Sequence, residues 1–121
     1  MKFDIFSLLK LINRVVDKDY DNFPYPPEFN DEFKLKVKKR DGFRCLKCNM
    51  SEEDHIRIYG IKEAVHHINF QKQDTTFSNC CTLCVKCNLE VNSNRYYWKN
   101  FFQSILSEQY GYQYNEMVIA K

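Results

Sequence analysis

Two Cys-x-x-Cys pairs constrain the fold of this chain more than any other feature. Cys45 and Cys48 form the first pair, and Cys84 and Cys87 form the second. Four thiolates are soft donors suited to tetrahedral zinc in a closed structural site, so the spacing predicts one zinc ion joining both segments. The alternative is four core cysteines without a metal. The segment between the pairs is longer than the roughly 15–20 residues of a plain zinc ribbon, which favours a cluster that supports an inserted hairpin.

The remaining cysteines and the N-terminus indicate the cellular setting. Two paired Cys-x-x-Cys units favour a reducing compartment over the disulfides of a secreted domain. Cys80 and Cys81 follow in a predicted strand, where we expect small buried side chains rather than ligands. Asp4 and Lys10 interrupt the apolar residues 1–13, so no export signal is expected, and no segment approaches the ~20 apolar residues of a membrane span. We therefore expect an intracellular protein without membrane association.

Helical spacing of apolar residues predicts an amphipathic helix over residues 3–16, suited to packing or partner contact. A second helix is expected to begin after Asn30 as N-cap, with acidic residues in its first turn, and to be closed by Gly42 in a left-handed conformation. Residues 51–61 read as a short helix or turn. These elements lie on either side of the first cysteine pair.

The second half of the chain predicts a hairpin followed by a helix. Strand candidates cover residues 63–70 and 80–85, with loop composition between them, and a helix is expected from about residue 85 to residue 106. Alternating tyrosines over residues 110–114 predict an edge strand or an aromatic flap. The expected fold class is therefore α+β.

The distribution of charge says more than the net charge of +2, which does not by itself identify a nucleic-acid binder. Lys and Arg gather over residues 34–47, opposed only by Asp41. Such a face would attract phosphate, although a solvated helix surface explains the same pattern. The alternative to a nucleic-acid contact is a surface salt bridge for Arg95 and an ordinary polar helix position for Asn92. The predicted nucleic-acid contacts are Lys38, Lys39, Arg40, Arg44, Asn92 and Arg95.

Two adjacent histidines lie between the cysteine pairs. Phosphodiester hydrolysis needs a base for the attacking water and positive charge near the phosphate and the departing oxygen, and His66, His67 and Asn88 match this requirement. Neighbouring side chains on a strand point to opposite faces, so both histidines can serve one site only where pairing ends, which we expect beside Asn69. On a helix Cys87 and Asn88 project about 100° apart, so one can face zinc and the other the hairpin.

This order of residues closely resembles the HNH endonuclease family in its zinc-bound ββα-metal (His-Me finger) form. The run 92–98 is similar to the continuation in phage and mobile-element members. The resemblance covers about residues 25–102 and implies a nuclease domain there, preceded by a helix and linker (1–24) and followed by a helix end and tail (103–121). The residues that carry it are Arg40-Asp41-Gly42-Phe43-Arg44-Cys45-x-x-Cys48, His66-His67-Ile68, Asn79 and Leu83-Cys84-x-x-Cys87-Asn88.

The resemblance assigns a role to each of these positions. It implies His67 as the general base, His66 as a ligand of a catalytic divalent ion, and Asn79 as the brace of the loop that orients the base. Many members have a histidine ligand at the position of Asn88, and some members have an asparagine ligand there. Because an amide oxygen with one imidazole is a harder ligand set than two imidazoles, we expect Mg²⁺ or Mn²⁺ there and Zn²⁺ only at the cysteines.

Two functions follow as hypotheses. The first is a metal-dependent endonuclease that hydrolyses DNA phosphodiester bonds, with limited sequence specificity or with a role in a larger nuclease or packaging assembly. The second is a catalytically decayed zinc module that binds nucleic acid or protein. Asn88 supports the second hypothesis, whereas the intact His66-His67 pair and Asn79 support the first.

Overall fold

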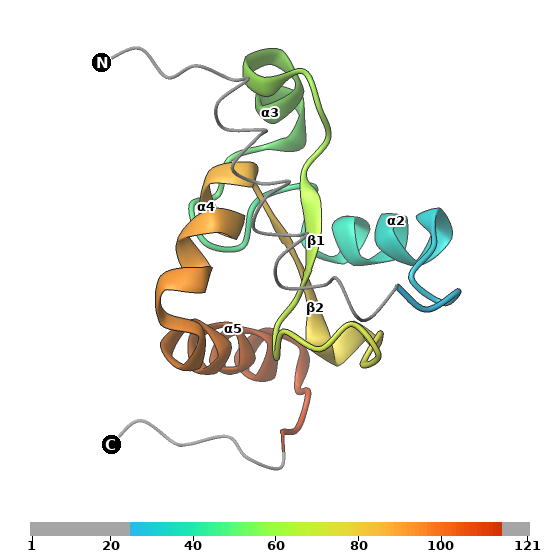
Figure 1. Cartoon of the computed structure of the whole chain (residues 1–121), viewed down its shortest axis with the longest axis vertical. Coiled ribbons are helices and arrows are strands. Elements are labelled where there is room, and N and C mark those ends of the chain that lie inside the picture. The colour runs from blue at the N-terminus through green and yellow to red at the C-terminus, as the bar shows by residue number, and fades with distance from the viewer. Residues whose placement is uncertain (1–24, 115–121) are drawn as a thin grey trace.

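The computed structural model describes residues 25–114 and shows helices around a two-stranded antiparallel sheet (Figure 1). The helix expected over residues 3–16 and the end of the tail lie outside the described residues. No helix within residues 25–114 has the length and apolar character to cross a membrane. The elements in chain order are α2 (Asp31–Arg40), α3 (Glu52–Tyr59), β1 (Ala64–His67), the 3₁₀ turn η1 (Phe77–Asn79), β2 (Cys80–Leu83), α4 (Val85–Glu90), the 3₁₀ turn η2 (Val91–Asn94) and α5 (Arg95–Tyr110).

The predicted hairpin is confirmed, with shorter strands than expected. β1 pairs with β2 in antiparallel register from Ala64 opposite Leu83 to His67 opposite Cys80. Pairing stops at His67 because the chain turns there: the Phe70 N–H donates to the His67 carbonyl at 2.9 Å, and Phe70 has a φ of 62°. The break therefore falls beside Asn69, as the sequence predicts. Every residue of β2 is buried, so the sheet forms the centre of the molecule.

The helix expected after Asn30 is confirmed as α2. The Asn30 side chain accepts a hydrogen bond from the Phe33 N–H at 2.9 Å, which satisfies one of the amides that a helix start leaves unpaired. Gly42 closes the helix with a φ of 70°, where a residue with a Cβ would be strained. At the same end the Asp41 carboxylate accepts from the Thr82 N–H at 2.8 Å, which ties α2 to β2.

The single helix expected over residues 85–106 is wrong in its continuity and its end. α4 stops at Glu90, η2 follows, and α5 runs on to Tyr110 in a new direction (Figure 1). The cause is local, because the Asn94 side chain caps α5 by accepting from the Tyr97 N–H at 3.2 Å. A short polar side chain that binds a nearby amide competes with the helix in this way.

The tyrosines at the end of α5 and after it form no strand within the described residues, so the flap alternative fits better than the edge strand. The Tyr110 hydroxyl donates to the Arg40 carbonyl at 2.8 Å, and the Tyr114 hydroxyl donates to the Ser78 carbonyl. These bonds connect the end of the described chain to α2 and to η1. The buried core beneath them joins sheet and helices through Ile68, Leu83, Val91, Phe102 and Leu106.

Candidate functional site

The two Cys-x-x-Cys pairs come together as the sequence predicts. The sulfur atoms of Cys45, Cys48, Cys84 and Cys87 all lie within 4.8 Å of one another. The Cys48 and Cys84 sulfurs are 3.7 Å apart, close to the about 3.8 Å that two thiolates span when each lies 2.3 Å from a tetrahedral zinc ion. Four sulfurs at such distances can hold a metal ion such as zinc.

Backbone amides hold both cysteine pairs in place. The Cys48 N–H points at the Cys45 sulfur at 3.5 Å, and the Cys87 N–H points at the Cys84 sulfur at 3.4 Å, so Cys84 also caps α4. The Leu46 N–H donates to the Thr82 carbonyl at 2.8 Å and attaches the first pair to β2. Because α4 begins where β2 ends, the cluster fixes the angle between the hairpin and this helix.

The protonation of the cluster also fits a cation. Hydrogen bonds from the Cys84 and Cys87 thiols lower the pKa of Cys45, and the hydrogen bond to Cys45 raises the pKa of Cys84 to about 12. The thiols thus share protons around one thiolate. A divalent metal takes over this charge balance by favouring the thiolate form of all its cysteine ligands.

His66 lies in an apolar pocket on the α5 side of the hairpin. Its ring packs edge-on against Phe70 at 4.8 Å and near Phe102 at 6.1 Å between centroids. Its Nε2 atom is buried and has no hydrogen-bond partner among the described residues. Burial, and then the positive charges that His67 and Arg95 can carry, lower its pKa to about 3. A neutral imidazole nitrogen that accepts no hydrogen bond can act as a metal ligand, and Nε2 of His66 fits this description, although Phe70 lies against the ring.

His67 lies on the opposite side of the hairpin, so the normal alternation of a strand holds for the histidine pair. Its Nε2 atom is 3.0 Å from the Thr75 hydroxyl, and the Phe29 ring packs on it at 4.6 Å. Burial lowers its pKa to about 4, with a further contribution from the charge of Lys72. The ring is therefore neutral at pH 7, but it is only 2 % exposed. The two histidines do not form one cluster in this conformation.

Asn79 braces the loop between the two strands. Its side chain accepts from the Asn69 N–H at 3.1 Å and donates to the Asn69 side chain and the Asp74 carbonyl, each at 2.8 Å. Its own carbonyl accepts from the Ile68 N–H at 2.7 Å. Asn79 thus closes the loop between the strands directly after His67.

Asn88, Asn92 and Arg95 form a connected series that runs from α4 to α5. The Asn92 side chain donates to the Asn88 carbonyl at 3.1 Å and accepts from the Arg95 guanidinium at 2.9 Å. The same guanidinium lies 4.6 Å from the centre of the Phe70 ring, which in turn contacts His66. Asn88 itself is half-buried on α4. These contacts connect Asn88, the expected amide ligand, with His66, the expected imidazole ligand.

The prediction that Lys38 lies on a basic surface of α2 is wrong. That side chain is 8 % exposed, and its ammonium lies 2.6 Å from the Glu52 carboxylate. Arg40 is also held within the protein, by Asp41 at 2.9 Å and by the Cys80 carbonyl at 2.6 Å. A phosphate contact from either would have to break these bonds. Lys39 and Arg44 remain exposed, with Arg44 donating to the Asn49 carbonyl at 3.0 Å.

His55 is a structural residue that sequence reasoning missed. It is fully buried, with Nδ1 2.7 Å from the Ile61 carbonyl and Nε2 accepting from the Val85 N–H at 3.1 Å. This bond satisfies the first free amide of α4, directly after Cys84, and requires a neutral ring. Burial lowers its pKa in agreement with that role. Thr75, the partner of His67, was missed as well, because a threonine in a polar loop carries no distinguishing signal.

Glu63 supplies a test of the electrostatics beside the cluster. It is 3 % exposed, its carboxylate oxygens have no partner among the described residues, and burial followed by the charge of Cys45 raises its pKa to about 7. The folded protein then holds a proton that the unfolded chain releases near pH 4.5, so stability falls as pH rises from 4.5 to 7.

Glu63→Gln should therefore stabilise the zinc-loaded protein at pH 8 by about 1–3 kcal/mol and much less at pH 5, measured by urea unfolding. Glu53→Gln, on the exposed side of α3, is the control, and an equal gain at both pH values would contradict the assignment.

Comparison with protein-family models, curated proteins and solved structures finds no match for this chain. A functional interpretation therefore depends on the geometry of its own residues.

Proposed function

We propose that this protein is a metal-dependent endonuclease of the HNH type that hydrolyses DNA phosphodiester bonds. The observation that carries the proposal is the joint arrangement of a hairpin, a following helix and a four-cysteine cluster, with His66 and His67 at the end of β1. The Asn79 bonds that close the loop beside His67 add to it. In this proposal residues 25–102 form the nuclease domain, and the hairpin with α4 is its ββα core.

The chemistry assigned to each residue follows from its protonation and its contacts. His67 is neutral at pH 7 and accepts a proton from the attacking water, while Thr75 and the braced loop orient its ring. His66 and Asn88 hold a divalent ion, Mg²⁺ or Mn²⁺, which when bound supplies positive charge to the phosphate and to the departing oxygen. Lys39, Arg44, Asn92 and Arg95 are the residues proposed to contact the DNA backbone.

One observation favours the second hypothesis, a zinc module that binds nucleic acid or protein without cutting. His67 is buried under Phe29, and its Nε2 atom is already bonded to Thr75. Water reaches the base only if the segment around Phe29 moves away. A chain in which that segment stays in place would bind and not hydrolyse.

The experiment that separates the two hypotheses measures nicking of supercoiled plasmid by the zinc-loaded protein with Mg²⁺, with Mn²⁺ and without added metal. We expect cutting by the wild type with either ion, and a loss of at least about 100-fold in His67→Ala, the range of a lost general base. The control is the zinc content and melting temperature of the variant, which show that the fold persists. Equal nicking by both proteins, or no nicking by the wild type with any divalent ion, would contradict the nuclease.

A further inference from the structure

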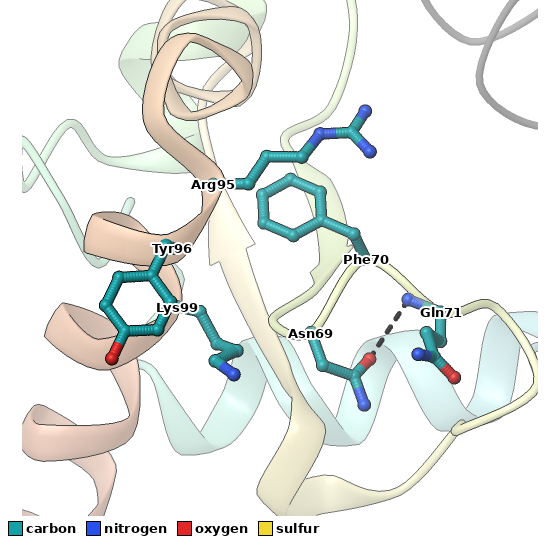
Figure 2. A pocket seen from close by; sticks show the side chains of 6 residues that line it. All are labelled: Asn69, Phe70, Gln71, Arg95, Tyr96 and Lys99. Atoms are coloured by element: carbon teal, nitrogen blue, oxygen red, sulfur yellow. Dashed lines mark hydrogen bonds between the residues drawn. The ribbon is translucent and has the colours of Figure 1, made fainter. Parts of the chain in front are cut away.

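Two adjoining cavities lie between the hairpin loop and α5, and together we call them the loop–α5 groove. The first has a volume of about 370 Å³ and is lined by Asn69, Phe70, Gln71, Arg95, Tyr96 and Lys99 (Figure 2). The second, of about 580 Å³, shares Asn69, Gln71 and Lys99 and continues to Asn79, Gln103 and Gln113. These volumes are in the range of sites for small organic groups.

One end of the groove is positively charged. Lys99 extends from α5 towards the loop, and its ammonium lies 5.6 Å from the Tyr96 ring (Figure 2). No carboxylate in the described part of the chain forms an ion pair with it. Arg95 lies one helical turn before Lys99 on the same face of α5, above Phe70. Both cations line the first cavity and can attract a phosphate group.

The other end of the groove is lined by several amides, together with Asp74 and the hydroxyl side chains of Thr76, Ser78 and Tyr114. Gln103 lies one turn beyond Lys99, is 8 % exposed, and has a buried Oε1 atom without a hydrogen-bond partner among the described residues. By contrast, the Asn69 and Asn79 side chains are already engaged in the loop brace. Primary amides match the donors and acceptors on the edge of a nucleobase. The unused bonding capacity of Gln103 therefore points to a base.

We propose that the loop–α5 groove binds one unpaired nucleotide of a DNA strand, with its phosphate at Arg95 and Lys99 and its base at Gln103. Tyr96 is 63 % exposed at the mouth of the groove and provides a face on which a neighbouring base can stack. Bases in a duplex are already paired and stacked, so a frayed, gapped or single-stranded substrate fits this groove better than intact duplex. The inference rests on the proposed function for its choice of DNA, and the groove lies against Phe70, which contacts His66.

The test is fluorescence anisotropy with the zinc-loaded His67→Ala protein, which holds the substrate without cutting it. The probes are a labelled single-stranded oligonucleotide and the same sequence as a duplex, each titrated at several salt concentrations. We expect at least about tenfold tighter binding of the single strand. Lys99→Gln should weaken that binding and lower its salt slope by about 0.7, the contribution of one phosphate contact on a single strand.

Two further variants separate the groove from general charge and from folding. Lys36→Gln removes an exposed lysine of α2 and should leave binding within about twofold of the parent. Gln103→Leu should weaken single-strand binding about three- to tenfold with an unchanged salt slope and an undiminished melting temperature, because it removes a buried unpaired oxygen. Equal affinity for single strand and duplex, or equal effects of Lys99→Gln and Lys36→Gln, would overturn the groove. Selective single-strand binding by a wild type that never cuts DNA would refute the nuclease and leave the groove standing.

Discussion

Replacing Cys84 by serine should abolish stoichiometric zinc binding and unfold most of the protein. Zinc contributes on the order of 10 kcal/mol to small domains of this kind, which matches or exceeds the whole stability of a typical domain. Cys84 is also the N-cap of α4 and follows β2 directly, so its loss releases the junction between sheet and helix. The measurements are zinc content per protein by mass spectrometry under native conditions and helical content by circular dichroism.

Cys80→Ser is the matched control, because Cys80 is a buried thiol of β2 outside the four-cysteine cluster. The Thr76 backbone N–H points to its sulfur and would serve a serine hydroxyl in the same way. We expect this variant to keep one zinc ion and to lose no more than about 1–2 kcal/mol of stability. A Cys84→Ser protein that keeps its zinc ion, or equal effects of both substitutions, would show that the cluster is not a zinc site. A folded, zinc-free Cys84→Ser protein would instead show that zinc does not hold the fold together.

The features that the sequence predicted well depend on neighbours along the chain. Hydrogen bonds from backbone amides, made to acceptors within four or five residues, complete the Asn30 cap, the Gly42 closure and each Cys-x-x-Cys turn. The two strands of the hairpin were predictable from their apolar segments, although a long loop, residues 68–79, separates them. The prediction that the two cysteine pairs meet required one further assumption, a shared metal ion. The geometry of the four sulfur atoms agrees with this assumption.

The features that were missed depend on partners far away in sequence. Lys38 reads as a surface cation on α2, but Glu52 of α3 pairs with it in the interior. His55 reads as one polar position of a short helix, but its two ring nitrogens bond to Ile61 and Val85. Such pairings are set by the packing of elements, which no local periodicity encodes.

The helix break at η2 shows a different limit. Apolar spacing continues through residues 85–106, so periodicity alone predicts one helix. Asn94 instead adopts a φ of −152° and caps a new helix at Arg95. The redirected α5 brings Arg95 and Phe70 together beside His66 and forms one wall of the loop–α5 groove. A local competition between side chain and backbone therefore decides where the candidate site lies.

Lowering the pH from 7 to 5 should remove several kcal/mol of stability through the histidines, and proton uptake by Glu63 over the same range should offset part of this loss. All three are buried with lowered pKa values, about 3 for His66 and about 4 for His67, against an ordinary value of 6.5. The unfolded chain takes up protons near pH 6.5, which the folded protein does not, so stability falls as pH falls below 6.5 towards about 4. At pH 5 each of His66 and His67 costs about 2 kcal/mol. The measurement is urea unfolding of the zinc-loaded protein, followed by circular dichroism across this range.

Zinc release from protonated thiolates also destabilises the protein in acid, so the histidine contribution needs its own variant. His66→Phe removes the titrating ring and keeps an aromatic side chain against Phe70 and Phe102, and it breaks no hydrogen bond at Nε2 because none exists there among the described residues. At pH 7 the variant should be within about 1 kcal/mol of the wild type, and at pH 5 it should be more stable by about 2 kcal/mol.

Zinc content measured at both pH values separates the two effects, because His66→Phe leaves the four thiols unchanged. If the variant and the wild type lose stability in parallel on acidification, His66 is not held neutral by burial. The same variant also examines the proposed catalytic ion, since a phenylalanine has no atom to bind it. Suppose that the folded His66→Phe protein is more stable than the wild type at pH 5 but no longer nicks plasmid. His66 would then serve the chemistry of the protein and not its packing. Retained nicking would remove His66 from the proposed ligand set.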